Sequence, residues 1–146
     1  MMTEELYDIL TRPKRLREDI GELDAKIDAC LTGLLPGSIR YDLPKVQTSP
    51  REKFPEVMAK VDELMDTRED KAKKLFKSIE EISTLANAID NNTQKAVIIM
   101  HYIGGMTLNE IGDKLGYTKG GIWHIHNKGI KFLEEVTDVT DVTDKV

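Results

Sequence analysis

Two long runs of apolar side chains at helical spacing constrain the fold of this chain more than any other feature. The first runs from Leu6 to Leu34 and the second from Val57 to Ile89, mostly in steps of three or four residues. This spacing gathers the apolar side chains on one narrow stripe of an α-helix. Each stripe needs a cover, so the sequence predicts two long helices that fold back as an antiparallel, coiled-coil-like hairpin, with a second copy of the chain as a further cover.

Prolines and glycines set the expected ends of the two helices. Pro13 interrupts the first stripe, so the main helix is expected to begin near it, after a short helical piece. Gly33, Pro36 and Gly37 are expected to end this helix. Residues 36–54 contain three prolines and no sustained period, which predicts a loop. The second helix is expected to start at Pro50 or Pro55 and to end at the sequence Asp-Asn-Asn.

The composition agrees with a nearly all-α protein. Of the 146 residues, 40% are hydrophobic, 32% are charged and only 5% are aromatic, which suits helices better than a sandwich or a barrel. Cys30 is the only cysteine, so the chain cannot form an internal disulfide. We expect its side chain to be a small buried apolar group. We also expect the protein to lie in a reducing compartment. The sequence lacks an apolar run of about 20 residues and a signal-peptide pattern, so we expect a soluble, cytoplasmic protein without a membrane partner.

Net positive charge is confined to one segment. The whole chain carries −5, but residues 94–133 hold five Lys and Arg against two Asp and Glu, together with all three histidines. Residues 1–93 and residues 134–146 each carry a net charge of −4. The sum over the chain therefore hides a basic region that can bind an anionic partner.

The basic segment contains a compact pair of helices in TLNEIGDKLGYTKGGIWHIHNKGIKFL, which runs from Thr107 to Leu133. Thr93 is expected to cap a preceding apolar helix that a Gly-Gly pair stops. Thr107 and Glu110 have the spacing of a capping box, in which Glu110 returns a bond to the Thr107 amide. Gly116 supplies the positive φ at which that short helix ends.

Thr118 is expected to cap a third helix that runs to about Val136, so the predicted motif is helix, tight turn, helix. Gly112 would let the short helix approach the third helix closely. The helical period points a largely apolar set inward, namely Leu108, Ile111, Leu115, Ile122, Ile125, Gly129 and Leu133. The opposite side of the third helix carries cations, an amide and an aromatic ring without an acid, namely Lys119, Trp123, His124, Asn127, Lys128 and Lys131.

These outward side chains suit the major groove of DNA. Asparagine pairs with adenine, histidine reaches base edges, and lysine neutralises phosphate. The free backbone amides at the starts of the two helices also bind phosphate oxygens. The predicted DNA-binding residues are Thr107, Thr118, Lys119, Gly120, Trp123, His124, Asn127, Lys128 and Lys131.

The same stretch resembles the helix-turn-helix of sigma-70-type factors, in the domain that reads the −35 promoter element. The matching residues are Thr107, Glu110, Ile111, Leu115, Gly116, Ile122, Ile125, Gly129, Ile130 and Leu133, with Thr118 and Gly112 in place of a serine and an alanine. Over residues 4–135 the chain also resembles small phage and prophage regulators of the ArpU type. The resemblance implies sequence-specific DNA binding in the control of phage transcription.

Gly120 and Gly121 depart from that pattern, which tends to place arginine or another long polar residue there. Two glycines in a first helical turn cost about 1 kcal/mol each in helix propensity relative to alanine, and they supply no side-chain contact to a base. Either the backbone comes very close to the DNA, or this chain reads fewer bases than its relatives.

Other interpretations of these residues lead away from DNA. His124 and His126 suggest a metal, but residues two apart point to different sides of a helix and no second Cys or His pair has ligand spacing, so we expect none. Trp123 is also typical of a surface that covers a protein partner. His101 and Tyr102 are expected to be packed or half-exposed rather than catalytic.

The sequence thus predicts an all-α protein with a helical hairpin in residues 1–90, a helix-turn-helix domain in residues 91–136 and an acidic flexible tail in residues 137–146. The tail repeats Val-Thr-Asp, which makes poor helix, and a second interpretation is that it competes with DNA for the basic strip.

We expect a DNA-binding transcriptional regulator of phage or prophage genes, with no catalytic site and no cofactor. Its expected partners are double-stranded DNA, RNA polymerase and further copies of the chain. The alternatives are a DNA-packaging recognition subunit of the small-terminase type and an adaptor that binds polymerase but not DNA.

Overall fold

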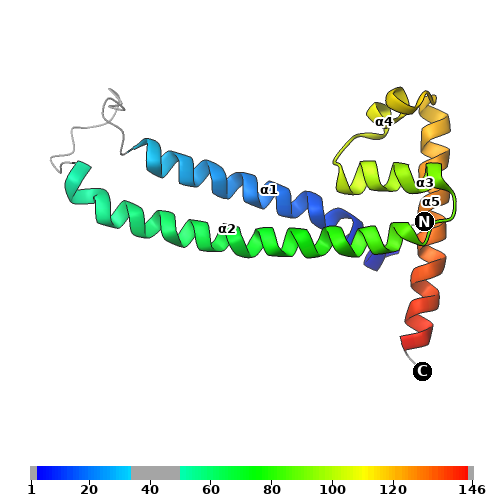
Figure 1. Ribbon diagram of the computed structural model, residues 1–146, viewed down its shortest axis with the longest axis horizontal. Coiled ribbons are helices and arrows are strands. Elements are labelled where there is room, and N and C mark those ends of the chain that lie inside the picture. Colours follow the sequence, from blue (N-terminus) through cyan, green and yellow to red (C-terminus); the bar gives the residue numbers. More distant parts are fainter. Residues whose placement is uncertain (1–2, 34–49, 145–146) are drawn as a thin grey trace. The chain divides into compact units, whose positions relative to one another are not determined.

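The computed structural model describes residues 3–33 and 50–144, and every regular element in those ranges is helical (Figure 1). In chain order the elements are α1 (Glu4–Thr32), α2 (Pro50–Asn87), α3 (Asn92–Ile98), the π-helix η1 (Ile99–Ile103), α4 (Leu108–Leu115) and α5 (Lys119–Asp144). The all-α prediction is confirmed. No helix in the described ranges combines the length and the apolar character that a membrane crossing requires.

The contacts divide the chain into two compact units. The stem unit comprises Leu16–Lys74, and the head unit comprises Met1–Arg15 together with Leu75–Val146. The first turns of α1 and the last turns of α2, which the sequence analysis grouped with the hairpin, therefore share a unit with α3, α4 and α5. The reason lies in the apolar side chains of those turns, which are buried in the head unit.

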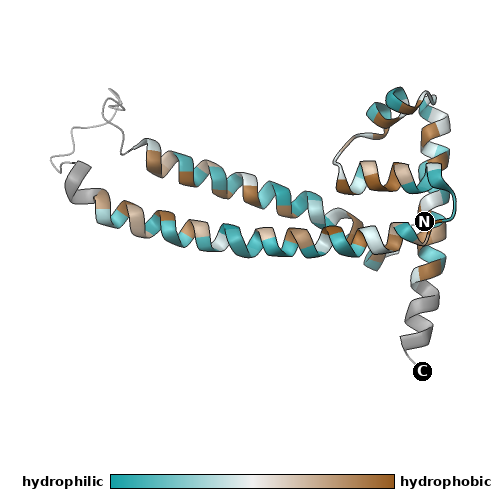
Figure 2. Ribbon diagram, in the orientation of Figure 1, coloured by the Kyte–Doolittle hydropathy of each residue, from teal (hydrophilic) through white to brown (hydrophobic). Residues whose placement is uncertain are grey.

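The stem unit is an antiparallel pair formed by α1 and α2. Asp19 pairs with Lys71 at 3.1 Å, and Asp24 pairs with Arg68. Higher residue numbers on α1 thus pair with lower residue numbers on α2, which makes the two helices antiparallel. Solvent-exposed pairs of this kind fix the register more than they stabilise the fold. The buried side chains are apolar, namely Leu16, Leu23, Val61 and Leu64, and hydrophobic and hydrophilic residues alternate along both helices (Figure 2).

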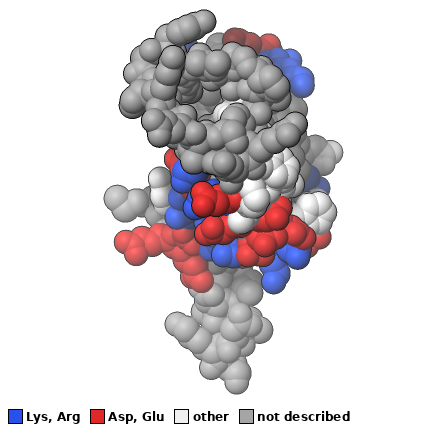
Figure 3. Space-filling view, turned by 90° about the vertical axis from the view of Figure 1, so that its left-hand side faces the viewer, with Lys and Arg blue, Asp and Glu red and all other residues white. Residues whose placement is uncertain are grey.

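Acidic and basic side chains are interspersed on the described part of the stem. The ion pair between Asp24 and Arg68 raises the pKa of the Arg68 guanidinium, chiefly through their hydrogen bond. Figure 3 shows the left-hand side of Figure 1, where Lys and Arg lie next to Asp and Glu and do not form a surface of one sign. This mixture does not favour binding of a polyanion to that side.

The head unit has a core to which α1, α2, α3 and α5 all contribute. Its buried members are Leu6, Leu10, Ile82, Ala86, Ile89, Ile98, Ile130 and Leu133. A smaller cluster joins Val97 of α3 to Ile111 of α4 and Ile122 of α5. Helix α5 takes part in both clusters and crosses α3 steeply (Figure 1). The inner side of α5 is thus covered along the segment that the helix-turn-helix uses.

Pro13 does not interrupt α1, which contradicts the predicted break. The helix is continuous from Glu4 to Thr32 and carries Pro13 inside it. A proline in a helix interior removes one backbone hydrogen bond and costs about 3 kcal/mol. The ring of Pro13 is fully buried, and burial of its apolar surface offsets part of that cost.

Several predicted helix ends were also wrong. Helix α2 starts at Pro50, one of the two predicted positions, but it ends at Asn87, before the Asp-Asn-Asn sequence. The N-cap of α3 is Asn91 rather than Thr93, since the Asn91 side chain accepts a hydrogen bond from the Gln94 amide at 3.0 Å. Residues 36–49 of the predicted loop lie outside the described residues. Cys30 is half-buried, not fully buried.

Helix α5 continues to Asp144, beyond the predicted end near Val136. Propagating an existing helix needs no new nucleus, so residues of modest propensity such as Val, Thr and Asp can extend it. The Thr137 hydroxyl also donates a hydrogen bond to the Leu133 carbonyl at 2.7 Å. Residues 137–144 therefore form helix where an irregular tail was expected.

Candidate nucleic-acid interface

The starts of α4 and α5 have the predicted caps. The Thr107 hydroxyl oxygen accepts a hydrogen bond from the Glu110 amide at 3.2 Å, and that of Thr118 accepts one from the Gly121 amide at 3.0 Å. Gly116 has a φ of 82°, the left-handed value expected where α4 ends. One detail differs, because the Glu110 carboxylate accepts from the Thr107 hydroxyl at 3.1 Å instead of from its backbone amide.

Two glycines bring the helices of the head unit close together. A Cβ atom on Gly112 would lie 3.2 Å from the Tyr117 carbonyl oxygen and 3.4 Å from the Ile122 side chain. A Cβ atom on Gly129 would lie 3.0 Å from the Ile98 side chain of α3. These distances are tighter than ordinary contacts, so the absence of a side chain lets α5 pack directly on α4 and α3, as predicted for Gly112.

The inward side of the motif agrees with the helical period at most positions. Ile111, Ile122, Gly129 and Leu133 are buried, and Leu108 and Ile125 are half-buried. Leu115 was predicted to face inward but is 36% exposed, because it is the last residue of α4 and the chain turns away at Gly116. Ile130, which the inward set left out, is buried in the larger core cluster.

All nine residues predicted to contact DNA are exposed. Thr107, Thr118 and Gly120 lie at helix starts, and the other six lie on one side of α5. We call the side chains of these six residues the outer face of α5, namely Lys119, Trp123, His124, Asn127, Lys128 and Lys131. Trp123 is 57% exposed, so more than half of its surface is open to a partner.

The outer face of α5 suits a polyanion by its charge. Residues 119–131 include three lysines and no aspartate or glutamate. At Gly120 an added Cβ atom would have nothing within 4 Å, so packing does not require glycine there. At Gly121 such an atom would lie 3.1 Å from the Thr118 hydroxyl oxygen, so the N-cap itself limits that position.

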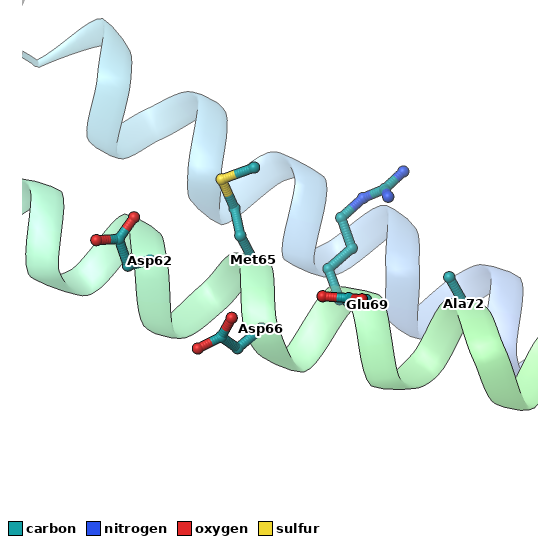
Figure 4. Close-up of a pocket in the computed structure, with 6 residues that line it drawn as sticks. Asp62, Met65, Asp66, Glu69 and Ala72 are labelled. Carbon is teal, nitrogen blue, oxygen red and sulfur yellow. The ribbon is translucent and has the colours of Figure 1, made fainter.

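The described residues line two surface hollows. One pocket of about 630 Å³ lies along α2 in the stem unit and is lined by Asp62, Met65, Asp66, Arg68, Glu69 and Ala72 (Figure 4). Three carboxylates against one guanidinium repel phosphate. A smaller hollow of about 250 Å³ lies at the turn of the motif, beside Asp113, Tyr117 and Lys119.

The sequence analysis missed a buried imidazole behind the outer face. The side chain of His126 is 6% exposed, and its Nε2 atom lies 2.7 Å from the Tyr102 hydroxyl oxygen. Burial lowers the pKa of His126, whereas burial raises the pKa of Tyr102 to about 12. His126 is four residues from both Ile122 and Ile130, so the helical period already marked it as inward.

His101 and Tyr102 are half-buried, in agreement with their expected packing. Both belong to the π-helix η1, and the His101 Nδ1 atom donates a hydrogen bond to the Met106 carbonyl at 2.7 Å, since a carbonyl can only accept. This bond ties η1 to the segment that leads into α4. His124 is exposed while His126 is buried, so the two imidazoles do not face one another.

Comparison with known proteins gives a family but no activity. Residues 37–134, more than half of the chain, match the family described as "Protein of unknown function (DUF1492)". The matched range contains α2, α3, η1, α4 and the outer face of α5. No curated protein and no solved structure matches the chain.

Proposed function

The chain belongs to the DUF1492 family, whose description names no activity, and we propose that this member is a sequence-specific DNA-binding regulator of transcription. In this proposal the outer face of α5 enters the major groove of double-stranded DNA. The protein acts by binding and not by catalysis, in the cytoplasm, on phage or prophage genes.

The observation that carries the proposal is the exposure of the outer face of α5 together with its chemistry. Asn127 and His124 can bond to base edges, and Lys128 and Lys131 can reach phosphates on either side. The inner side of the same helix is buried against α3 and α4, so the outer face is held by a rigid support. A helix backbone that is held in place before binding favours base recognition, because its ordering then adds little to the entropy cost of binding.

The starts of α4 and α5 add contacts that do not depend on sequence. Thr107 and Thr118 are exposed N-caps, and backbone amides at a helix start bind phosphate oxygens. Exposed Gly120 leaves room for the DNA backbone to approach α5. We therefore propose that these three residues position the motif on the DNA backbone. The outer face of α5 recognises the bases.

The stem unit supports a further part of the proposal, association between copies of the chain. Leu31, Phe54 and Met65 are large apolar side chains on the stem, and each is at least 42% exposed. Exposed apolar side chains on a helical hairpin favour burial against another protein. We propose further copies of the chain, with RNA polymerase as a second protein partner.

The same exposed apolar residues favour a second function, recognition of viral DNA for packaging. A subunit of the small-terminase type also joins a helix-turn-helix to a helical assembly region. Light scattering on the purified full chain separates the two functions, because a ring of many copies would favour packaging and a dimer would favour regulation.

Selection of bound sequences from random duplex DNA, with the purified full chain, tests the proposed function. We expect one enriched motif that the protein binds at least about 10³-fold more tightly than random duplex at fixed salt. A selection that enriches no motif, although the protein is folded, would reject sequence-specific regulation. Binding to polymerase without any binding to DNA would favour the adaptor.

A further inference from the structure

We propose that Tyr102, His126 and Asn127 form a hydrogen-bonded chain that presents the Asn127 amide to DNA as a donor. Tyr102 and His126 are then positioning residues for base recognition, although neither lies on the outer face of α5. This inference rests on the proposed function and names how one residue of the interface acquires its specificity.

The chain of hydrogen bonds begins with the burial of His126. Its side chain is 6% exposed, although its neighbours Trp123 and Asn127 are exposed. A buried imidazole needs partners for both ring nitrogens, because an unpaired polar atom inside a protein is costly. Both partners are present, since Nε2 lies 2.7 Å from the Tyr102 hydroxyl oxygen and Nδ1 lies 3.3 Å from Asn127 Oδ1.

The Asn127 oxygen at one end sets the donor and acceptor of each hydrogen bond in the series. An amide oxygen can only accept, so Nδ1 of His126 carries the hydrogen and donates it to Asn127 Oδ1. Nε2 of the neutral ring is then an acceptor, and the Tyr102 hydroxyl donates to it. The lowered pKa of His126 keeps the ring neutral at pH 7, and the raised pKa of Tyr102 keeps the phenol protonated.

The neighbouring groups leave this arrangement intact. The His101 ring centre lies 5.5 Å from that of His126, but its own Nδ1–H is bound to the Met106 carbonyl. Trp123 stacks on the His126 ring, with ring centres 5.8 Å apart and an angle of 26° between the planes. His126 therefore orients the indole of Trp123 as well as the amide of Asn127.

The hydrogen bond to His126 determines which groups of Asn127 remain available to DNA. Its oxygen faces His126, so the two hydrogens on Nδ2 are the groups that Asn127 offers to a base. Acceptors in the major groove are N7 of both purines, O6 of guanine and O4 of thymine, whereas the cytosine edge offers only a donor. We therefore expect the base opposite Asn127 to be one with an acceptor at its major-groove edge.

Tyr102→Phe removes the phenol hydroxyl and keeps the ring. His126 Nε2 then has no donor, so the ring hydrogen can move to Nε2 and Asn127 can turn its Nδ2 group inward. We expect the long-range proton–nitrogen NMR spectrum of the full chain to change from the Nδ1–H form of His126 to a mixture. Discrimination at one position of the selected motif should fall by about tenfold, in line with the value of one side-chain contact to a base.

Two further variants separate positioning from general damage. Thr84→Val, which also removes a hydroxyl from an exposed residue of the head unit, should leave both the spectrum and the base preference unchanged. In an Asn127→Ala background, Tyr102→Phe should no longer alter discrimination at that position, because the residue it positions is gone. Binding to random duplex should stay within about twofold in Tyr102→Phe, since the lysines of the outer face are untouched.

The outcomes decide between the proposals. A change of His126 form together with loss of preference at one position, absent in the Asn127→Ala background, supports the positioning chain. Unchanged preference in Tyr102→Phe, or an Nε2–H form in the unsubstituted chain, overturns it while the proposed function stands. If the unsubstituted chain prefers no duplex sequence at all, both the proposed function and this inference fail.

Discussion

Replacing Leu6 with alanine should lower the free energy of unfolding of the full chain by about 2–5 kcal/mol, the range for a buried leucine in a core. Leu6 is fully buried in a cluster with Ile98 of α3 and with Ile130 and Leu133 of α5. The lost side chain leaves a cavity beneath the helix that we assign to DNA reading. Urea unfolding followed by circular dichroism measures the change.

Glu22→Ala is the control on the same helix, because Glu22 is an exposed residue of α1 in the stem unit. Its substitution should change the free energy of unfolding by no more than about 0.5 kcal/mol. Equal effects of the two substitutions would contradict the assignment of the first turns of α1 to the head unit. Hydrogen exchange should also show faster exchange of α5 amides in Leu6→Ala but not in Glu22→Ala.

The second large effect is expected from the double substitution Lys128→Ala and Lys131→Ala. Both lysines are exposed on the outer face of α5, and each is assigned to one phosphate. Loss of two such contacts should weaken binding to all duplex sequences and reduce the slope of log K against log salt by nearly two units, at ~0.9 per phosphate. Titrations at several salt concentrations, with the selected duplex and with a random one, measure both quantities.

The control is the pair Lys60→Ala and Lys73→Ala in the stem unit, which changes the net charge by the same amount. Both residues are exposed and pair with glutamates on α2. We expect the salt slope of this variant to equal that of the unsubstituted chain. A slope that responds equally to the two double substitutions would show that overall charge, and not the outer face of α5, determines the affinity.

The parts of the fold that were predictable from sequence depend on interactions over a few residues. Caps at Thr107 and Thr118 and the positive φ at Gly116 follow from side chains that bond to backbone groups three positions away or from the freedom of glycine. The helical period also separated most buried from exposed positions on α5. The exposed location of the predicted DNA-binding residues was therefore accessible from local patterns, whereas their binding to DNA stays a prediction.

The features that were not predictable depend on contacts between distant segments. The burial of Leu6 against α5 placed the start of α1 in the head unit, and no local pattern carries that pairing. Burial also overrode local preference at Pro13, which lies inside α1. His126 is the instructive case, because its spacing marked it as inward while its chemistry suggested a surface role. A buried histidine makes sense only once the Tyr102 hydroxyl is known to lie beside it.

NMR titration of the full, nitrogen-labelled chain with the selected duplex tests most directly the claim that the outer face of α5 reads DNA. We predict that the largest shifts will occur at the Trp123 indole N–H, the Asn127 side-chain amide and the backbone amides of residues 119–131, with small shifts in the stem unit. Shifts concentrated in the stem unit, with the Trp123 and Asn127 signals unmoved at saturating duplex, would contradict the account.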